Sequence, residues 1–395
     1  MLAFVVPGDV DPFGEELANY LRQVEERNPS IASARIEAEA AGVDVRSAKW
    51  QRAPNVALEG AYYGVQGRAP NNVTPRATVD MPIWSAGRIS GVIQRASALR
   101  DAAAAGLQEV RQELTLQAIE QYFEYKRLSA RIDTIDQELV DLQAMQDAME
   151  RRTQQGVSAN SDLALARTRT LQVRMMRDAF YWQRQSSLQR LREYAVDPTF
   201  TVSAGGLSPA LVLRGELEDM IQTASARDPR RRRIEAEAVA AQASARTAAA
   251  ARFPALNVQY SYDDIYRHRL GLALKVQGTG LAEFSAARAA RLREDAAHER
   301  TDAVSNDLRT AIINDYVNYA SARARLDVAV NSSTSSEDVK ASYMRQFAAG
   351  KRSWFDVMNA AREAMTARLD AIDLRYGAGI AQLRLLVRLG ATPKQ

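Results

Sequence analysis

The residues that could carry acid–base or metal chemistry are few in this sequence. It has two histidines, His268 and His298, and no cysteine, so disulfides and thiolate metal sites are excluded. The stretch HERTD at 298–302 lacks the His-Glu-x-x-His spacing of a zinc site. Neither histidine has a nucleophile partner, and the sequence has no glycine-rich phosphate loop. We therefore predict that the protein is not an enzyme and has no cofactor or metal site.

One motif places a charge at a defined break in a helical pattern. In RQFAAGKRSWFDV (345–357), Gly350 can end a helix where a positive φ costs little. Ser353 and Asp356 then form the Ser-x-x-Asp start of another helix, where a carboxylate is favourable. Capping accounts for the glycine and the serine, and it leaves open whether Asp356 has a further role.

A second interruption, TQQGVSANSDLALAR (153–167), also places an aspartate six residues after a glycine, here Gly156 and Asp162. Its serine spacing differs, so Ser158 or Asn160 would have to cap the following helix. The glycines of the two interruptions are 194 residues apart, as expected for equivalent points of a duplicated chain.

Other segments are duplicated as well. RNPSIASARIEAEAA and RDPRRRRIEAEAVAA occupy matching places, and Pro29 and Pro54 recur 200 residues later as Pro229 and Pro254. Several markers in the same order indicate two repeats.

Each repeat contains a long, alanine-rich span without proline. In the first repeat its apolar residues step by 4, 3, 4 and 3, at Leu128, Ile132, Ile135, Leu139 and Leu142. This spacing is that of a coiled-coil seam. As a helix, the span from 85 to 155 would extend ~105 Å, which is far longer than a globular domain needs.

Before each long span, apolar and polar residues alternate with period two, which is typical of a strand with one apolar face. In the second repeat the apolar positions are Leu256, Val258, Tyr260 and Tyr262, then Leu270, Leu272, Leu274 and Val276. We therefore predict a mainly α fold with long coiled-coil helices and two β-hairpins per chain.

These patterns divide the chain as follows. The first repeat, 12–200, comprises a short helix, a β-hairpin at 55–83, a long helix at 85–155 and a helix at 157–195. A linker covers 201–214. The second repeat, 215–390, comprises a helix, a β-hairpin at 255–277, a long helix at 281–349 and a helix at 353–390.

The four predicted strands require further copies of the chain. The smallest bacterial barrels have about eight strands, and open strand edges favour pairing with another molecule. The shorter helical segments 12–53 and 157–195 are together about as long as helix 85–155, so they can stack end to end along it. We expect an oligomer that closes both a barrel and a tube of helices.

Charge and hydropathy exclude other classes of protein. The formal net charge is +4, from 52 basic and 48 acidic residues, which does not favour binding to nucleic acid. Arg230 to Arg233 form one basic run, which we interpret as a solvated helix start. No stretch approaches the ~18–20 apolar residues of a membrane-spanning helix. The start, MLAFVVPGDVDPFG, lacks the basic region of a signal peptide, so we presume that any signal has been removed.

The pattern resembles the TolC family of outer-membrane efflux and secretion channels over nearly the whole chain. The resemblance is carried by NPSI (28–31), AKWQRAPNV (48–56), MPIWSAGRI (81–89) and the two Gly-x5-Asp motifs. It implies a homotrimer with a twelve-stranded outer-membrane β-barrel and a periplasmic α-helical tunnel. It also implies an equatorial segment formed by the linker and the chain ends.

In this family the glycine motifs are hairpin tips at the periplasmic mouth. The resemblance therefore makes Gly156, Ser158, Gly350 and Ser353 tip residues that contact a periplasmic adaptor. It makes Asp356 and Asn359, six and nine residues after the inner glycine, the pore constriction.

The resemblance also implies a latch that holds the mouth closed. In the family, a basic residue two positions after the inner glycine pairs with an acidic residue of the outer tip, which correspond here to Arg352 and Asp162. The aromatic residue three positions before that glycine is Phe347, which cannot donate a hydrogen bond as a tyrosine does.

The implied location is the cell outer membrane, extending into the periplasm. The implied partners are outer-membrane lipid, a periplasmic adaptor (membrane fusion protein) and an inner-membrane ABC transporter or proton-driven pump. AAGKRSWFDVMNAARE (348–363) is most similar to channels that export adhesins, so we predict the exit duct of a tripartite type I secretion system for polypeptides. The outer-membrane component of a small-molecule or multidrug efflux pump is the alternative. A soluble coiled-coil scaffold is a remote alternative, because a scaffold needs no strand hairpins.

Overall fold

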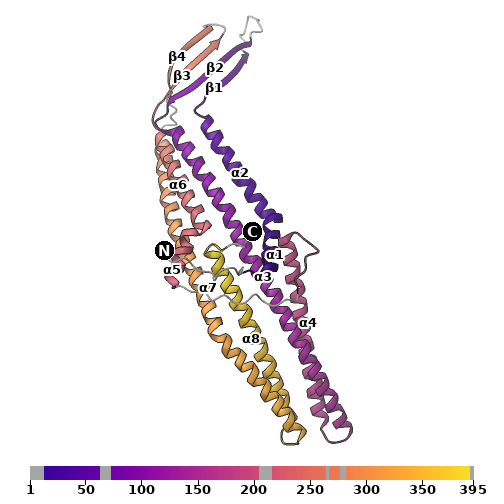
Figure 1. The fold of residues 1–395 in the computed structure, drawn as a ribbon. Coiled ribbons are helices and arrows are strands. Elements are labelled where there is room, and N and C mark those ends of the chain that lie inside the picture. The colour runs from indigo at the N-terminus through magenta and orange to yellow at the C-terminus, as the bar shows by residue number, and fades with distance from the viewer. Residues whose placement is uncertain (1–12, 63–72, 204–215, 264–266, 276–281, 392–395) are drawn as a thin grey trace. The chain divides into compact units, whose positions relative to one another are not determined.

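The computed structural model describes residues 13–62, 73–203, 216–263, 267–275 and 282–391. Its elements are α1 (Glu15–Arg27), α2 (Pro29–Trp50), β1 (Asn55–Tyr62), β2 (Val73–Trp84), α3 (Arg88–Gln154), α4 (Asn160–Ala195), α5 (Leu217–Arg227), α6 (Pro229–Ala250), β3 (Ala255–Asp263), β4 (Arg267–Lys275), α7 (Ala282–Ala348) and α8 (Trp354–Arg388) (Figure 1). Long helices and two β-hairpins confirm the predicted fold class. Among the described helices, none is both long and apolar enough to cross a membrane.

Parts of several predicted segments lie outside the described residues. They are 204–214 of the predicted linker, 63–72 of the first predicted hairpin, 264–266 and 276–277 of the second, and residue 281 of the second long helix.

The helical segment before each hairpin is divided in two, where the sequence predicted one continuous helix. The breaks fall at Asn28 and Asp228, both in extended conformation (ψ 125° and 123°) and both followed by proline. A residue before proline is disfavoured in the α region, and proline is well accommodated in the first turn of the next helix. The Asp228 side chain also caps α6 by accepting a hydrogen bond from the Arg231 backbone N–H.

The chain forms two compact units, each assembled from segments that are far apart in sequence. One unit, here called the strand unit, comprises residues 30–110 and 228–308. The other, here called the helical unit, comprises 1–29, 111–227 and 309–395. The long helices α3 and α7 contribute residues to both units.

In the strand unit, the strands form one antiparallel sheet with the order β1-β2-β3-β4 (Figure 1). The register sets apolar residues opposite each other on one face, for example Val258 opposite Leu272 and Val79 opposite Tyr260. On the other face, Lys275 pairs with Asp80 at 2.9 Å. The predicted alternation is therefore present in the sheet.

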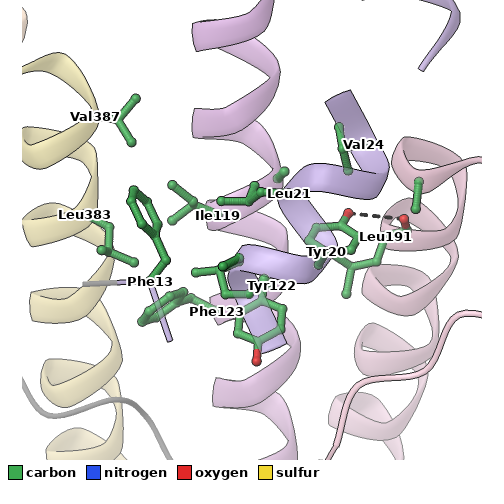
Figure 2. Packing of buried hydrophobic residues seen from close by; sticks show 14 of the residues in the cluster. Phe13, Tyr20, Leu21, Val24, Ile119, Tyr122, Phe123, Leu191, Leu383 and Val387 are labelled. Atoms are coloured by element: carbon green, nitrogen blue, oxygen red, sulfur yellow. Dashed lines mark hydrogen bonds between the residues drawn. The ribbon is translucent and has the colours of Figure 1, made fainter. Parts of the chain in front are cut away.

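The largest core of the helical unit is rich in aromatic rings and is called the aromatic core below (Figure 2). Its rings come from Phe13, Tyr20, Tyr122, Phe123 and Tyr376, with Phe200 packed against them. The Tyr20 and Phe200 ring centroids are 4.7 Å apart, and the Tyr20 hydroxyl donates to the Leu191 carbonyl at 3.1 Å. These contacts join α1, α3, α4 and α8.

A carboxylate beside the aromatic core holds the segment that follows α4. Glu16 accepts hydrogen bonds from the Ser203 backbone N–H (2.5 Å), the Ser203 hydroxyl (2.8 Å) and the Tyr122 hydroxyl (2.7 Å), and it pairs with Lys126 at 3.2 Å. Burial alone would raise the pKa of Glu16, but these hydrogen bonds outweigh it and lower the pKa below its ordinary value. Glu16 is therefore a fixed charge at neutral pH.

Candidate functional site at the hairpin ends

The helical unit contains two helical hairpins, α3–α4 and α7–α8, whose turns lie at one end of it (Figure 1). The turns have the same geometry. Gly156 and Gly350 have φ of 72° and 73°, in the left-handed region that favours glycine. Each donates to the carbonyl three residues before it, and the next N–H bonds five residues back, to the carbonyls of Arg152 and Gln346. This double bond pattern is the Schellman ending of a helix.

The two hairpins differ in how the second helix begins. The Ser353 hydroxyl caps α8 by accepting from the Asp356 backbone N–H at 3.2 Å, as the Ser-x-x-Asp spacing predicted. The N-cap of α4 is Ala159, with no side-chain hydrogen bond. The expectation that Ser158 or Asn160 caps this helix is therefore wrong. Ser158 instead accepts a hydrogen bond from Arg152 Nε at 3.2 Å.

Arg352 makes its described contacts within its own turn. Its Nε donates to the Gln346 side chain at 3.2 Å, its Nη1 lies 3.8 Å from the Asp356 carboxylate, and its guanidinium lies 4.2 Å from the centre of the Tyr343 ring. Among the described residues, no ion pair joins Arg352 to Asp162 within the chain.

The remaining predicted site residues lie in the first two turns of α4 and α8. Asp162 is in the first turn of α4, and its backbone N–H donates to the Ala159 carbonyl at 3.1 Å. Asp356 and Asn359 lie one turn apart in α8 and are both half-buried. The structure therefore brings Arg352, Ser353 and Asp356 together and keeps Asp162 on the other hairpin.

Beneath the turns, the four helices share a second core, called the methionine core below. Its apolar residues include six methionines, which are Met145, Met149, Met176, Met344, Met358 and Met365. Methionine is unbranched and has three rotatable side-chain bonds, so it adapts to irregular packing. The ends of both hairpins thus rest on a core that is rich in flexible side chains.

A buried ion cluster joins α3 to α7 and α8 farther from the turns. Lys340 lies 3.0 Å from Glu138, 3.2 Å from Asp141 and 3.6 Å from Glu337, and Arg368 pairs with Glu337 at 2.7 Å. The side chains of Lys340 and Glu138 are 8% and 2% exposed. Burial raises the pKa of Glu138. Burial alone would lower the pKa of Lys340, but the surrounding carboxylates together outweigh it and raise that pKa.

One contact joins the two turns directly. The Arg152 guanidinium of the α3–α4 turn lies 4.9 Å from the centre of the Phe347 ring in the α7–α8 turn. This distance is within the range of a cation–π interaction. Sequence reasoning identified Phe347 but missed Arg152, because a cation that contacts an aromatic ring across 195 residues leaves no local spacing signal.

Sequence reasoning also missed the ion cluster. The charges of Glu138 and Lys340 are unremarkable in a chain with 100 charged residues, and only their packing shows that they are buried. The one available signal was that Glu138 lies between Ile135 and Leu139, close to the predicted coiled-coil seam.

The fold is that of known outer-membrane channels. The chain superposes on the outer-membrane channel OprN with a TM-score of 0.85 and 17% identity, covering 97% of this chain and 92% of that one. For VceC of Vibrio cholerae the TM-score is 0.82, the identity 16% and the coverage 95% and 96%. For the CmeC channel of Campylobacter jejuni the TM-score is 0.78 and the identity 12%, and the superposition covers 99% of this chain and 90% of that one.

A comparison of the sequence with protein-family models also gives a match. Residues 20–195 match the sequence model of the outer membrane efflux protein family. This part of the chain, which includes the α3–α4 turn, is therefore similar to that family, and the predicted resemblance to TolC-type outer-membrane channels is confirmed. No curated protein sequence matches the chain.

Proposed function

We propose that this protein forms a homotrimeric efflux duct through the outer membrane, with the hairpin ends as its periplasmic mouth. The family match and the shared fold support an outer-membrane efflux channel. The assembly, the mouth and the partners, a periplasmic adaptor and an inner-membrane pump, belong to the proposal.

The observation that carries this proposal is the exposed apolar face of the sheet. Leu270, Leu272 and Leu274 of β4 are 76%, 69% and 65% exposed, and Val56 and Leu58 of β1 are 63% and 80% exposed. Among the described strands of one chain, β1 and β4 each have a neighbour on one side only. Three copies would pair these edges in a twelve-stranded barrel, and membrane lipid would cover the apolar face.

The mass of the protein in detergent tests this assembly. Light scattering with the detergent contribution subtracted should give three times the chain mass of 43.6 kDa. A folded monomer in detergent would contradict the proposal, because its strand edges would then be stable unpaired.

For the mouth, we propose that Asp356 and Asn359 of three subunits line the constriction. The Asp356 backbone N–H already bonds to the Ser353 hydroxyl at the start of α8. Contributing its carboxylate to a ring of three would be a second role for Asp356. At ~6 Å in water two such charges repel by only ~0.7 kcal/mol, so the ring would attract cations without preventing closure.

The cation preference of the channel tests this role. Asp356→Ala should weaken cation selectivity and block by multivalent cations in planar bilayers, whereas Asp370→Ala, farther along α8, should leave both unchanged. If selectivity and block persist in Asp356→Ala, the carboxylate serves only the helix start.

The predicted latch between Arg352 and Asp162 is proposed as a contact between neighbouring subunits. Within one chain, Arg352 bonds to Gln346 and lies near Asp356 in its own turn. Pairing with Asp162 of a neighbouring subunit would replace these weak contacts by another weak one. An exposed pair contributes ~0.2–1 kcal/mol, which a docking adaptor could overcome.

For the cargo, small-molecule efflux is the first candidate, because the matching family is one of efflux proteins. Polypeptide export through a type I system is the second candidate, supported by the similarity of residues 348–363 to adhesin-exporting channels. Deletion of the gene should sensitise cells to toxic small molecules in the first case and abolish secretion of a specific large protein in the second.

A further inference from the structure

We infer that Arg152 holds the two hairpin ends of one chain together through the Phe347 ring, and that this contact regulates the opening of the mouth. The contact itself is a feature of the single chain. Its effect on opening rests on the proposed channel function.

Arg152 is held in place by hydrogen bonds within its own hairpin, and its guanidinium also contacts the other hairpin. Its carbonyl accepts from the Val157 N–H at 2.9 Å in the helix ending, and its Nε donates to the Ser158 hydroxyl at 3.2 Å. The guanidinium then lies 4.9 Å from the Phe347 ring centre. Two bonds to the turn around Gly156 thus direct one cation toward the second hairpin.

The Phe347 ring is held equally firmly on its side. It packs on the Trp354 ring with centroids 5.0 Å apart and planes inclined by 52°. Trp354 is the first residue of α8 and is buried in the methionine core. The Phe347 carbonyl also accepts from the Gly350 N–H at 3.0 Å, so the ring is tied to the α7–α8 turn.

The other arginine at the hairpin ends does not make this connection. Arg352 bonds within its own turn, to Gln346 and Asp356, and stacks on Tyr343 of the same hairpin. Among the interactions described for the two turns, the cation that crosses from one to the other is therefore Arg152 rather than Arg352.

The chemistry of the contact suits a reversible link. Arg152 and Phe347 are both half-buried, so separating them exposes an arginine and a ring edge to water and leaves no buried charge unpaired. An exposed cation–π contact changes an equilibrium by about two- to fivefold. Its attraction comes from the ring quadrupole, so it requires an aromatic side chain and not merely an apolar one.

The link can be tested without any measurement of conduction. In purified full-length protein, hydrogen exchange is followed by mass spectrometry in the peptide that contains Gly350 and Lys351. Their N–H groups bond within the α7–α8 turn. Arg152→Ala changes only the opposite hairpin, and it should speed exchange in this peptide about two- to fivefold. Arg151→Ala is the matched control, because Arg151 is an exposed arginine one residue earlier on the same helix.

Substitutions of the ring separate a cation–π contact from simple packing. Phe347→Tyr keeps an aromatic ring and should not speed exchange in the turn when Arg152 is present. Phe347→Leu keeps an apolar side chain and should speed exchange. Combining Phe347→Leu with Arg152→Ala should add little to either single change, because both remove the same contact.

Single-channel recording then tests regulation. Arg152→Ala and Phe347→Leu should each raise the open probability by about two- to fivefold, while Arg151→Ala and Phe347→Tyr should not. If Arg152→Ala and Arg151→Ala have the same exchange rate in the turn peptide and the same open probability, the link does not exist. If it speeds exchange without changing open probability, the link exists and does not regulate the mouth. Absence of conduction in every variant would contradict the channel function, whereas the exchange data would still decide the contact.

Discussion

The two cores of the helical unit share α3, α4 and α8 but pack them with different side chains. The aromatic core uses rings, including Tyr20 and Tyr122, whose hydroxyls bond to the Leu191 carbonyl and to Glu16. The methionine core has six thioether side chains together with the rings of Trp354, Phe180, Tyr343 and Phe347. Rings with bonded hydroxyls have few alternative positions, whereas methionine has many rotamers. We infer that the first core fixes one arrangement of the helices and the second permits several.

The charged groups beside the cores differ in the same way. Glu16 receives three hydrogen bonds from neutral donors in addition to Lys126. Glu138 is almost fully buried, and Lys340 is its described partner. The Glu16 site is therefore satisfied by many small contributions, while the Glu138 site depends on one opposite charge. Loss of a single residue should have the larger effect in the second case.

The largest expected effect is the loss of Lys340. Lys340→Met leaves Glu138 buried without its partner, and removal of one member of a buried pair costs about 3–5 kcal/mol. Lys340→Met combined with Glu138→Leu removes both charges and should recover most of that stability. Thermal unfolding in detergent, followed by circular dichroism, measures both.

Lys126→Met is the matched change beside the aromatic core, because Glu16 keeps its three neutral donors. It should destabilise the protein much less than Lys340→Met does. Equal effects of the two lysine substitutions would show that the two charged sites do not differ as described.

A smaller effect is expected from substitutions within the cores. Tyr122→Leu removes a ring and the hydroxyl that bonds Glu16, and it should cost about 2–4 kcal/mol. Met358→Leu conserves volume in the adaptable core and should cost less than about 1.5 kcal/mol. Denaturation of the two variants, compared with the parent, gives the difference. A loss for Met358→Leu as large as for Tyr122→Leu would mean that the methionine core is packed as specifically as the aromatic one.

Much of this contrast could not be read from the sequence. The duplication, the long helices, the hairpins and the two turns follow from local periodicity and from Gly156 and Gly350, so they were predictable. The breaks at Asn28 and Asp228 also have a local cause, which is the proline that follows each. They were not predicted from the sequence, because the helical pattern continues on both sides of the proline. The pairing of Lys340 with Glu138 spans 202 residues and depends on how helices pack. Local patterns do not encode such contacts, and the same is true of Arg152 and Phe347.

The smallest expected effect is a difference in the response of the two regions to acid. The pKa of Glu16 is lowered from its ordinary value of 4.5 by hydrogen bonds to the charged form. Its contribution to stability is therefore present above pH 4.5 and is lost as the pH falls through the lowered pKa. The pKa of Glu138 is raised from the same ordinary value by burial. Its folded environment favours the protonated form, so its contribution is fully present below pH 4.5 and is lost as the pH rises through the raised pKa.

Acidification from neutral pH should therefore first strengthen the packing around Glu138, and should weaken the packing around Glu16 only below about pH 4.5. Hydrogen exchange, corrected for its intrinsic pH dependence, can follow the two regions separately through peptides of α7 near Lys340 and of α1 near Glu16. Glu138→Gln should abolish the acid-induced protection in α7 and leave the response of α1 unchanged. If α7 instead loses protection on mild acidification in the parent protein, then the ion pair with Lys340 outweighs the burial of Glu138, and the two carboxylates respond to acid in the same direction.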